Sequence, residues 1–509
     1  MKLKLIAALA ATLGTTGAFA ACPTVATDVD TLDELVNHCA PEVTFFMGGA
    51  TAQAGAIDSV MTGTSEIFDL SKPRAKVYLT DAGVTGLNGG TDRTRSNSVG
   101  YIGFGAAGKP HAGKRVLVIY AKANGSAAGV YQVLTGKGSL AGEDVTLKTV
   151  SAAEQKAGTA GTCTINLDST AGSLGDVSCP SMVSFNTAWG LDKQKTMHLA
   201  FSDVYPDELS PGLIKKWDRV KFPATRTAMQ GFGVIVNPAL YTALINKNIT
   251  EGKLDASCAS SEVVGGTTDA ISFACQPTIS RADYSALISD ATMTAAKLLN
   301  NAADTTKLVL ARRVDSSGTQ ASSNIFFAGQ AAYNAKVKAP AVDGFLTLLN
   351  TTDTKAGVFA ANAGFDVEVK NGTSDVITSV SNTADYRIGV VSLENTYALA
   401  KASSKLKGAL FVKIDGQSPN MSTAGLDSKH RKGMQNGYGF AFEMSTVAPA
   451  KLATDAKLAS HKAIADAVTA GLQDPAYNLS GIAYINSADT AKNTTYTHGG
   501  VNNLPMVKN

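Results

Sequence analysis

The sequence predicts an α/β fold with mostly parallel sheets and helices on both sheet faces. Apolar, strand-like runs alternate with helix-like segments along most of the chain, a pattern typical of parallel-sheet proteins. The run 115–121 (RVLVIYA) is almost continuously apolar and β-branched, as expected of a strand buried on both faces. Several such runs end in polar residues just before a helix, and ligands of open α/β sheets bind at these carboxyl ends of strands.

The individual elements follow from this alternation. We expect strands at 44–47, 115–121, 197–203, 231–237, 307–311 and 386–393. We expect helices at 52–61, 130–134, 279–299, 321–335, 394–402 and 452–472. Residues 138–193 are rich in Gly, Ser and Thr and carry two cysteines, so we interpret them as a disulfide-bonded insertion at the surface.

The first twenty residues have the pattern of a secretory signal. Lys2 and Lys4 form its charged start, residues 5–13 its apolar centre, and residues 18–20 (AFA) a small-x-small cleavage site. We therefore expect cleavage after Ala20 and a periplasmic or secreted protein. The segment up to Cys22 also gives a looser match to a lipoprotein signal.

The charge balance argues against a nucleic-acid or membrane surface. The chain has 45 Lys and Arg residues and 42 Asp and Glu residues, and Lys2 and Lys4 leave with the signal, so the remaining net charge is +1. A nearly neutral protein has no broad basic field. An anionic ligand would have to be held by a few local groups. The length of 509 residues suits two or three lobes.

The six cysteines suit an oxidising compartment. They lie as three neighbouring couples, Cys22 with Cys39, Cys163 with Cys179, and Cys258 with Cys275, although spacing alone does not fix the pairing. The sequence has no Cys-x-x-Cys motif, and its six histidines are isolated from one another. Neither residue type therefore indicates a metal site, and we expect no cofactor.

The stretch 312–320 (RRVDSSGTQ) has the character of an anion site, because it lies between an expected strand and an expected helix. Backbone N–H groups at a helix N-terminus have no partner, and the helix dipole adds about half a positive charge there. Ser316, Ser317 and Thr319 add hydroxyl donors, and Arg313 adds a guanidinium that suits a tetrahedral oxyanion. The same residues would also serve as an ordinary helix cap and turn.

Three further junctions of the same kind favour the anion site. Thr51 and Ser126 each lie where an expected strand leads into an expected helix, and Asp203 ends the strand 197–203. Since ligands of such sheets bind at the carboxyl ends of strands, we expect these residues and the Arg313 loop to form one site.

These junctions carry a family resemblance. The segments are Gly48-Gly49-Ala50-Thr51, Gly125-Ser126-x-x-Gly129, Phe201-Ser202-Asp203 and Arg313-x-Asp315-x-Ser317-Gly318-Thr319. In this order they resemble the signature segments of the periplasmic phosphate-binding protein of the high-affinity phosphate ABC transporter. Segments 231–238 and 387–392 resemble that family's two chain crossings between lobes. The matching pieces extend from about residue 44 to about residue 399, and the last motif is the most specific.

The resemblance implies a two-lobed, hinged periplasmic-binding-protein-like fold of type II. Lobe 1 would comprise 21–237 with 392–509, and lobe 2 would comprise 238–391. The implied phosphate ligands are Thr51, the Ala52 N–H, Ser126, Asp203, Arg313, Ser317, the Gly318 N–H and Thr319. The implied partners are inorganic phosphate and an ABC permease in the inner membrane. We expect a monomer without metal, catalytic residues or nucleic-acid binding.

The chemistry of these residue types agrees with phosphate. An ionised aspartate only accepts hydrogen bonds, so Asp203 can accept one from a P–OH group. Sulfate has no proton to donate and would meet carboxylate repulsion instead. Two other functions stay open at this point: a secreted phosphatase on the same scaffold, and a surface or matrix protein that retains the fold. A phosphatase would need a base or metal ions beside a nucleophile such as Ser317 or Thr51.

Overall fold

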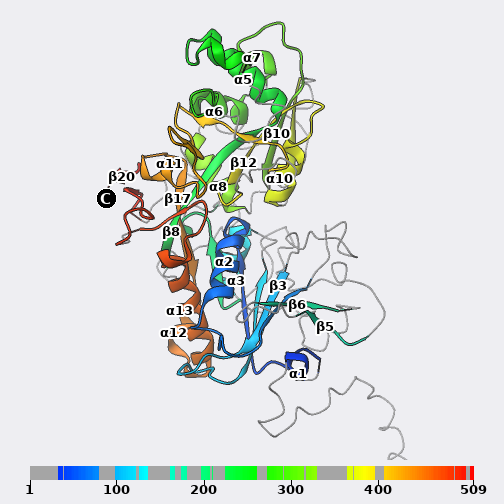
Figure 1. Cartoon of the computed structure of the whole chain (residues 1–509), viewed down its shortest axis with the longest axis vertical. Coiled ribbons are helices and arrows are strands. Elements are labelled where there is room, and N and C mark those ends of the chain that lie inside the picture. Colours follow the sequence, from blue (N-terminus) through cyan, green and yellow to red (C-terminus); the bar gives the residue numbers. More distant parts are fainter. Residues whose placement is uncertain are drawn as a thin grey trace, which may run out of the picture. The chain divides into compact units, whose positions relative to one another are not determined.

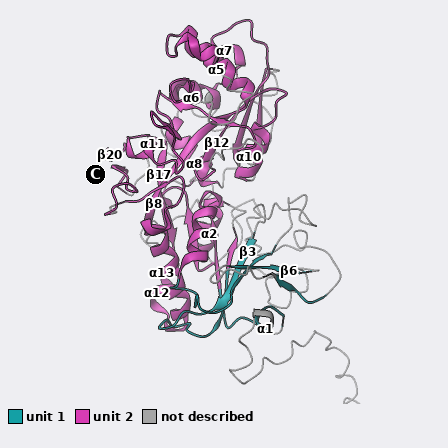
Figure 2. Cartoon of the chain, viewed as in Figure 1, with its two compact units in different colours: residues 1–44, 65–118, 150–193 teal, residues 45–64, 119–149, 194–509 magenta. Residues whose placement is uncertain are grey.

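The computed structural model describes most of the chain in two compact units (Figures 1 and 2). The described residues are 32–37, 39–79, 98–121, 125–135, 161–166, 174–179, 197–206, 209, 224–260, 272–290, 292–313, 317–328, 364–370, 372–395, 406–485, 488–499 and 505–508. The expected signal at 1–20 and Cys22 lie outside them. No helix of the described ranges has both the length and the apolar character to cross a membrane.

The smaller unit comprises residues 1–44, 65–118 and 150–193. Its elements are α1 (Leu32–Asn37), β2 (Ala75–Tyr78), β3 (Ser98–Phe104), β5 (Thr164–Asn166) and β6 (Gly175–Ser178). Strand β2 pairs antiparallel with β3 and parallel with β6, and β5 pairs antiparallel with β6. The described part of the expected insertion is therefore not all loop, since it supplies β5 and β6 to a sheet.

The predicted disulfides Cys163–Cys179 and Cys258–Cys275 are both formed. The first joins residues that flank β5 and β6. Cys39 is also disulfide-bonded, and its expected partner Cys22 lies outside the described residues.

The larger unit comprises residues 45–64, 119–149 and 194–509. The boundaries between the units fall within β1 (Val43–Gly49) and β4 (Arg115–Ala121), so each of these strands has residues in both units. The helices of the larger unit are η1 (Thr51–Gln53), α2 (Ala54–Gly63), α3 (Gly125–Thr135), α5 (Pro238–Thr250), η4 (Ala256–Ser260), α6 (Arg281–Ser289), α7 (Ala295–Leu299), α8 (Gly318–Ala328), α10 (Thr373–Val380), α11 (Lys432–Gln435), α12 (Ala450–Thr454), η7 (Ala456–Leu458), α13 (Ala459–Gln473) and η8 (Pro475–Tyr477). Its longer strands are β7 (Leu199–Ser202), β8 (Ala224–Val236), β10 (Leu308–Arg313), β11 (Phe365–Lys370), β12 (Tyr386–Ser392) and β17 (Ala441–Val447).

Short strands complete the larger unit. They are β9 (Thr278–Ile279), β13 (Leu410–Phe411), β14 (Lys413–Ile414), β15 (Met421–Ser422), β16 (Gly425–Leu426), β18 (Ile482–Ala483), β19 (Tyr496–Thr497) and β20 (Val507–Lys508). The helix expected at 394–402 is not seen in its described part, where residues 394 and 395 form a turn; residues 396–402 lie outside the description.

The long strand β8 connects two ladders. Its residues 232–236 run antiparallel to β12, and β12, β10 and β11 continue side by side as parallel neighbours. Its residues 224–231 run antiparallel to β17, which is antiparallel to β7, and β7 is parallel to β1. The α/β class is confirmed, but the sheet is more mixed than expected, because β8 and β17 run against their neighbours.

Helices cover both faces of the β10–β12 ladder, as predicted (Figure 1). Successive side chains of a strand point to opposite faces. Leu308 and Leu310 pack in one cluster with residues of α5, α7 and α8, whereas Ala311 packs in another with Val376 and Val380 of α10. This two-sided burial explains why these strands are nearly continuous apolar runs.

Candidate functional site

Three elements of the larger unit converge on Asp203, which follows β7 and is 1% exposed. The backbone N–H of Asp203 donates a hydrogen bond to Ser126 Oγ at 3.2 Å. Thr319 Oγ1 donates to Asp203 Oδ2, also at 3.2 Å. Ser126 lies in the first turn of α3 and Thr319 in the first turn of α8. Two helix N-termini and one strand end therefore meet at a single buried carboxylate.

Gly318 permits this close approach. A Cβ at its position would lie 2.2 Å from Ser126 Oγ and 2.9 Å from Asp203 Cβ, so any larger residue would force the elements apart. Gly318 and Thr319 open α8, where backbone N–H groups lack intrahelical partners. The Thr319 N–H helps to lower the pKa of Asp203. The first turn of α8 thus presents its positive end to the carboxylate.

Arg313 supplies the positive charge of the site. It ends β10, is 2% exposed, and its Nη1 donates to Thr373 Oγ1 at 2.9 Å. Its backbone N–H donates to Gln320 Oε1 at 2.9 Å. Burial lowers the pKa of Arg313 to about 10, while Asp203 and Asp375 act in the opposite direction. The guanidinium therefore stays charged at neutral pH and lies within electrostatic reach of Asp203.

Burial of Asp203 disfavours the ionised form of its carboxyl in the folded protein. Burial raises its pKa to about 6, against the opposing effects of Arg313, Thr319 and Gln53. The carboxylate is consequently charged at neutral pH, and burying that charge destabilises the folded protein.

We expect Asp203→Asn to increase the free energy of unfolding at pH 8. The unfolded carboxyl has a pKa of 3.8, so between about pH 4 and pH 6 the folded state binds the extra proton. Stability from Asp203 therefore falls as the pH rises through this window, by on the order of 2 to 3 kcal/mol. Urea unfolding in phosphate-free buffer should show the variant's advantage at pH 8 and not at pH 4. An equal difference at both pH values would contradict the buried charge.

The turn after β1 lies against the end of β7. Because β1 and β7 are parallel neighbours, their carboxyl ends share one edge, and the Ala50 N–H donates to Phe201 O at 3.0 Å. Thr51 opens η1 and is half-buried, whereas Ala52 is fully buried. Gln53 is fully buried and its Nε2 donates to Ser202 O at 2.8 Å.

Ser317 precedes α8 and is 1% exposed; its Oγ accepts a hydrogen bond from the Gln320 N–H at 3.4 Å. It thus already serves as the helix cap that the sequence also allowed. Asp315 and Ser316 lie outside the described residues. The structure therefore brings together Ser126, Asp203, Arg313, Gly318 and Thr319, with Ser317 at the start of the same helix.

Sequence reasoning missed Gln53, Gln320 and Thr373. Gln320 belongs to the stretch 312–320, but nothing in that stretch predicts its contact with the Arg313 N–H, and Gln53 lies two residues after Thr51. Thr373 is 60 positions from Arg313, and no local pattern marks it as a partner. In the described residues, no group of three or more His, Cys, Asp and Glu side chains is placed to hold a metal ion.

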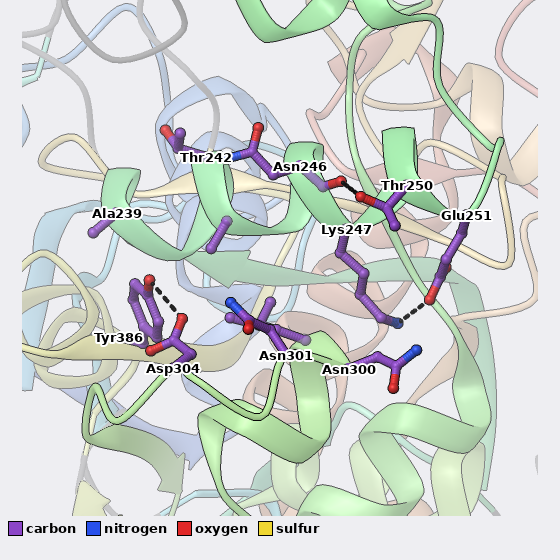
Figure 3. Close-up of a pocket in the computed structure, with 12 residues that line it drawn as sticks. Ala239, Thr242, Asn246, Lys247, Thr250, Glu251, Asn300, Asn301, Asp304 and Tyr386 are labelled. Carbon is purple, nitrogen blue, oxygen red and sulfur yellow. Dashed lines mark hydrogen bonds and ion pairs between the residues drawn. The ribbon is translucent and has the colours of Figure 1, made fainter.

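A separate cavity of about 530 Å³ lies on α5 (Figure 3). Its other wall is formed by the end of α7, the residues after it, and Tyr386. Tyr386 Oη donates to Asp304 Oδ2 at 3.1 Å, and Lys247 pairs with Glu251 at 3.3 Å. It contains none of the expected phosphate ligands.

Comparisons with known proteins add structural likenesses only. No protein-family model matches the chain, and no curated protein matches it. Similar solved structures include an ABC-type phosphate transport receptor from Vibrio cholerae, with 11% identity over 85% of this chain and 95% of that one and a TM-score of 0.35. A phosphate ABC transporter substrate-binding protein with bound phosphate from Clostridium perfringens has 9% identity over 86% and 98%, with a TM-score of 0.38. PstS from Borrelia burgdorferi has 12% identity over 84% and 97%, with a TM-score of 0.28.

Proposed function

We propose that this chain is a non-enzymatic, exported binding protein for inorganic phosphate. The proposed ligands are Thr51, the Ala52 N–H, Ser126, Asp203, Arg313, Ser317, the Gly318 N–H and Thr319. Because every TM-score above is below 0.5, we base this proposal on the site's residues and on the signature segments in the sequence.

One observation carries the proposal: Asp203, Ser126 and Thr319 share direct hydrogen bonds at two helix N-termini, beside the buried Arg313 guanidinium. Hydroxyls, free N–H groups and a guanidinium are the donors that a dehydrated phosphate needs. Asp203 is the one acceptor among them. In our proposal phosphate replaces the direct Thr319–Asp203 bond, so that Thr319 donates to a phosphate oxygen and Asp203 accepts from a P–OH group.

Calorimetry with phosphate and sulfate tests this function. The protein purified without phosphate should bind phosphate at neutral pH and should bind sulfate much more weakly. Absence of phosphate binding, or equal binding of the two anions, would refute the proposal.

We expect Asp203→Asn to narrow the preference for phosphate over sulfate. The asparagine amide can donate to an unprotonated oxygen, so the repulsion that excludes sulfate disappears. Phosphate affinity should fall by roughly tenfold while sulfate affinity rises. Calorimetry on both anions measures the ratio, with Asp304→Asn in the separate cavity as the matched control. An unchanged ratio would remove Asp203 from the site.

The proposal extends to the organisation and partners of the protein. Lobe 1 (21–237 with 392–509) and lobe 2 (238–391) would close on the anion, and the monomeric complex would deliver phosphate to an ABC permease. Cleavage after Ala20 would place the mature protein in the periplasm or outside the cell.

A further inference from the structure

Gln53 presents a hydrogen-bond acceptor beside the proposed phosphate site. Its Nε2 donates to Ser202 O, and a backbone carbonyl only accepts, so this bond fixes which end of the amide carries nitrogen. The other end, Oε1, is buried and has no hydrogen-bond partner among the described residues. Gln53 also lies close enough to Asp203 to lower the pKa of that carboxyl.

Asp203 presents a second acceptor of the same kind. Thr319 donates to its Oδ2, whereas Oδ1 is buried and lacks a hydrogen-bond partner within the described part of the chain. A buried acceptor that receives no hydrogen bond costs free energy, so both oxygens favour a ligand with O–H donors. A ligand with two such donors can satisfy both.

The charges around these acceptors disfavour a dianion. Glu394, after β12, accepts a hydrogen bond from the Gly55 N–H at 3.2 Å, two residues beyond Gln53. Burial raises the pKa of the Tyr120 phenol, and the negative charges of Glu394 and Asp203 raise it further, so both carboxylates lie within electrostatic range of Tyr120. The Arg313 guanidinium interacts electrostatically with Asp203 and also with Asp375. A doubly charged anion beside these acceptors would meet about twice the repulsion from Asp203 and Glu394 that a singly charged anion meets.

We propose that the site selects dihydrogen phosphate, the singly charged form with two P–OH groups, and that Gln53 is a specificity-determining residue. Asp203 Oδ1 accepts from one P–OH group and Gln53 Oε1 from the other. Glu394 strengthens the selection by repelling the doubly charged form. This inference rests on the proposed phosphate-binding function.

Phosphate titration by calorimetry at pH 6.5 and pH 8.5 tests the inference, because the second ionisation of phosphate lies between these values. Asp203, with a pKa of about 6, is mainly ionised at both. The natural sequence should bind phosphate roughly tenfold more weakly at pH 8.5. Gln53→Met should weaken binding at pH 6.5 by roughly five- to tenfold and change it little at pH 8.5. Glu394→Gln should instead strengthen binding at pH 8.5.

Gln132→Met is the matched control. Gln132 is 2% exposed, its Oε1 lacks a hydrogen-bond partner among the described residues, as Gln53 Oε1 does, and it lies six residues after Ser126 in α3. This variant should keep the pH dependence of the natural sequence. If the natural sequence binds no phosphate at either pH, the proposed function itself is wrong. If it binds equally at both, or if Gln53→Met keeps its pH ratio, the selection of dihydrogen phosphate is wrong. Glu394→Gln keeps the test decisive should Gln53→Met fail to fold.

Discussion

Arg313→Met is expected to weaken phosphate binding by on the order of 100-fold or more, the largest effect of any single change in the site. Methionine fills a similar volume but removes the buried guanidinium that faces Asp203 and donates to Thr373 Oγ1. Since Arg313 also holds down the pKa of Asp203, its loss should raise that pKa above 6 and leave part of the carboxyl protonated at neutral pH. The variant should therefore lose selectivity as well as affinity.

Arg312→Met is the control for this variant. Arg312 is the preceding residue of β10 and is 5% exposed, but alternation along the strand turns it to the opposite face, where it interacts with Tyr284 of α6. Calorimetry should show near-normal phosphate affinity for Arg312→Met and partial affinity for Arg313→Lys, which keeps the charge without the planar fork. Equal losses for Arg312→Met and Arg313→Met would mean that arginine burial, not anion contact, is being measured.

Gly318→Ala is expected to weaken phosphate binding by roughly 10- to 100-fold. The added Cβ would lie 2.2 Å from Ser126 Oγ and 3.0 Å from Asp203 Oδ2, and both residues are buried and cannot move aside easily. The first turn of α8 would have to shift, and its N–H and hydroxyl donors would no longer converge with Ser126. Alanine is itself a better helix former than glycine, so the loss cannot come from helix propensity.

Gly439→Ala provides the comparison. Its added Cβ would meet only the edge of the Phe326 ring, at 3.3 Å, and that ring can give by a few tenths of an ångström. Affinity for phosphate should change by less than about twofold in this variant. Normal phosphate binding by Gly318→Ala would show that α8 does not approach Ser126 and Asp203 in the binding-competent protein.

The site residues that could be predicted from the sequence are those that neighbouring residues in the chain identify. Ser126, Asp203 and Thr319 each lie where an apolar strand gives way to a helix, so their position at the carboxyl edge of a sheet could be predicted from nearby residues. Gln53 and Thr373 could not be predicted in the same way, because each is defined by one contact with a residue more than 50 positions away.

The sequence pattern also could not predict which strands run parallel and which run antiparallel to their neighbours. Side chains alternate in the same way in parallel and antiparallel strands, so periodicity did not indicate that β8 and β17 run against their neighbours. The first half of β8 was missed because Thr225, Arg226 and Thr227 interrupt its apolar pattern. The helix α8 begins three residues earlier than expected, since Gly318 and Thr319 form its first turn instead of a preceding loop.

A crystal structure grown with phosphate tests the convergence of these residues most directly. We expect one phosphate ion between the Arg313 guanidinium and the first turn of α8, within hydrogen-bonding distance of Ser126 Oγ, Thr319 Oγ1 and Asp203 Oδ1. Phosphate bound elsewhere, with the Thr319–Asp203 hydrogen bond intact and no anion beside Arg313, would contradict it.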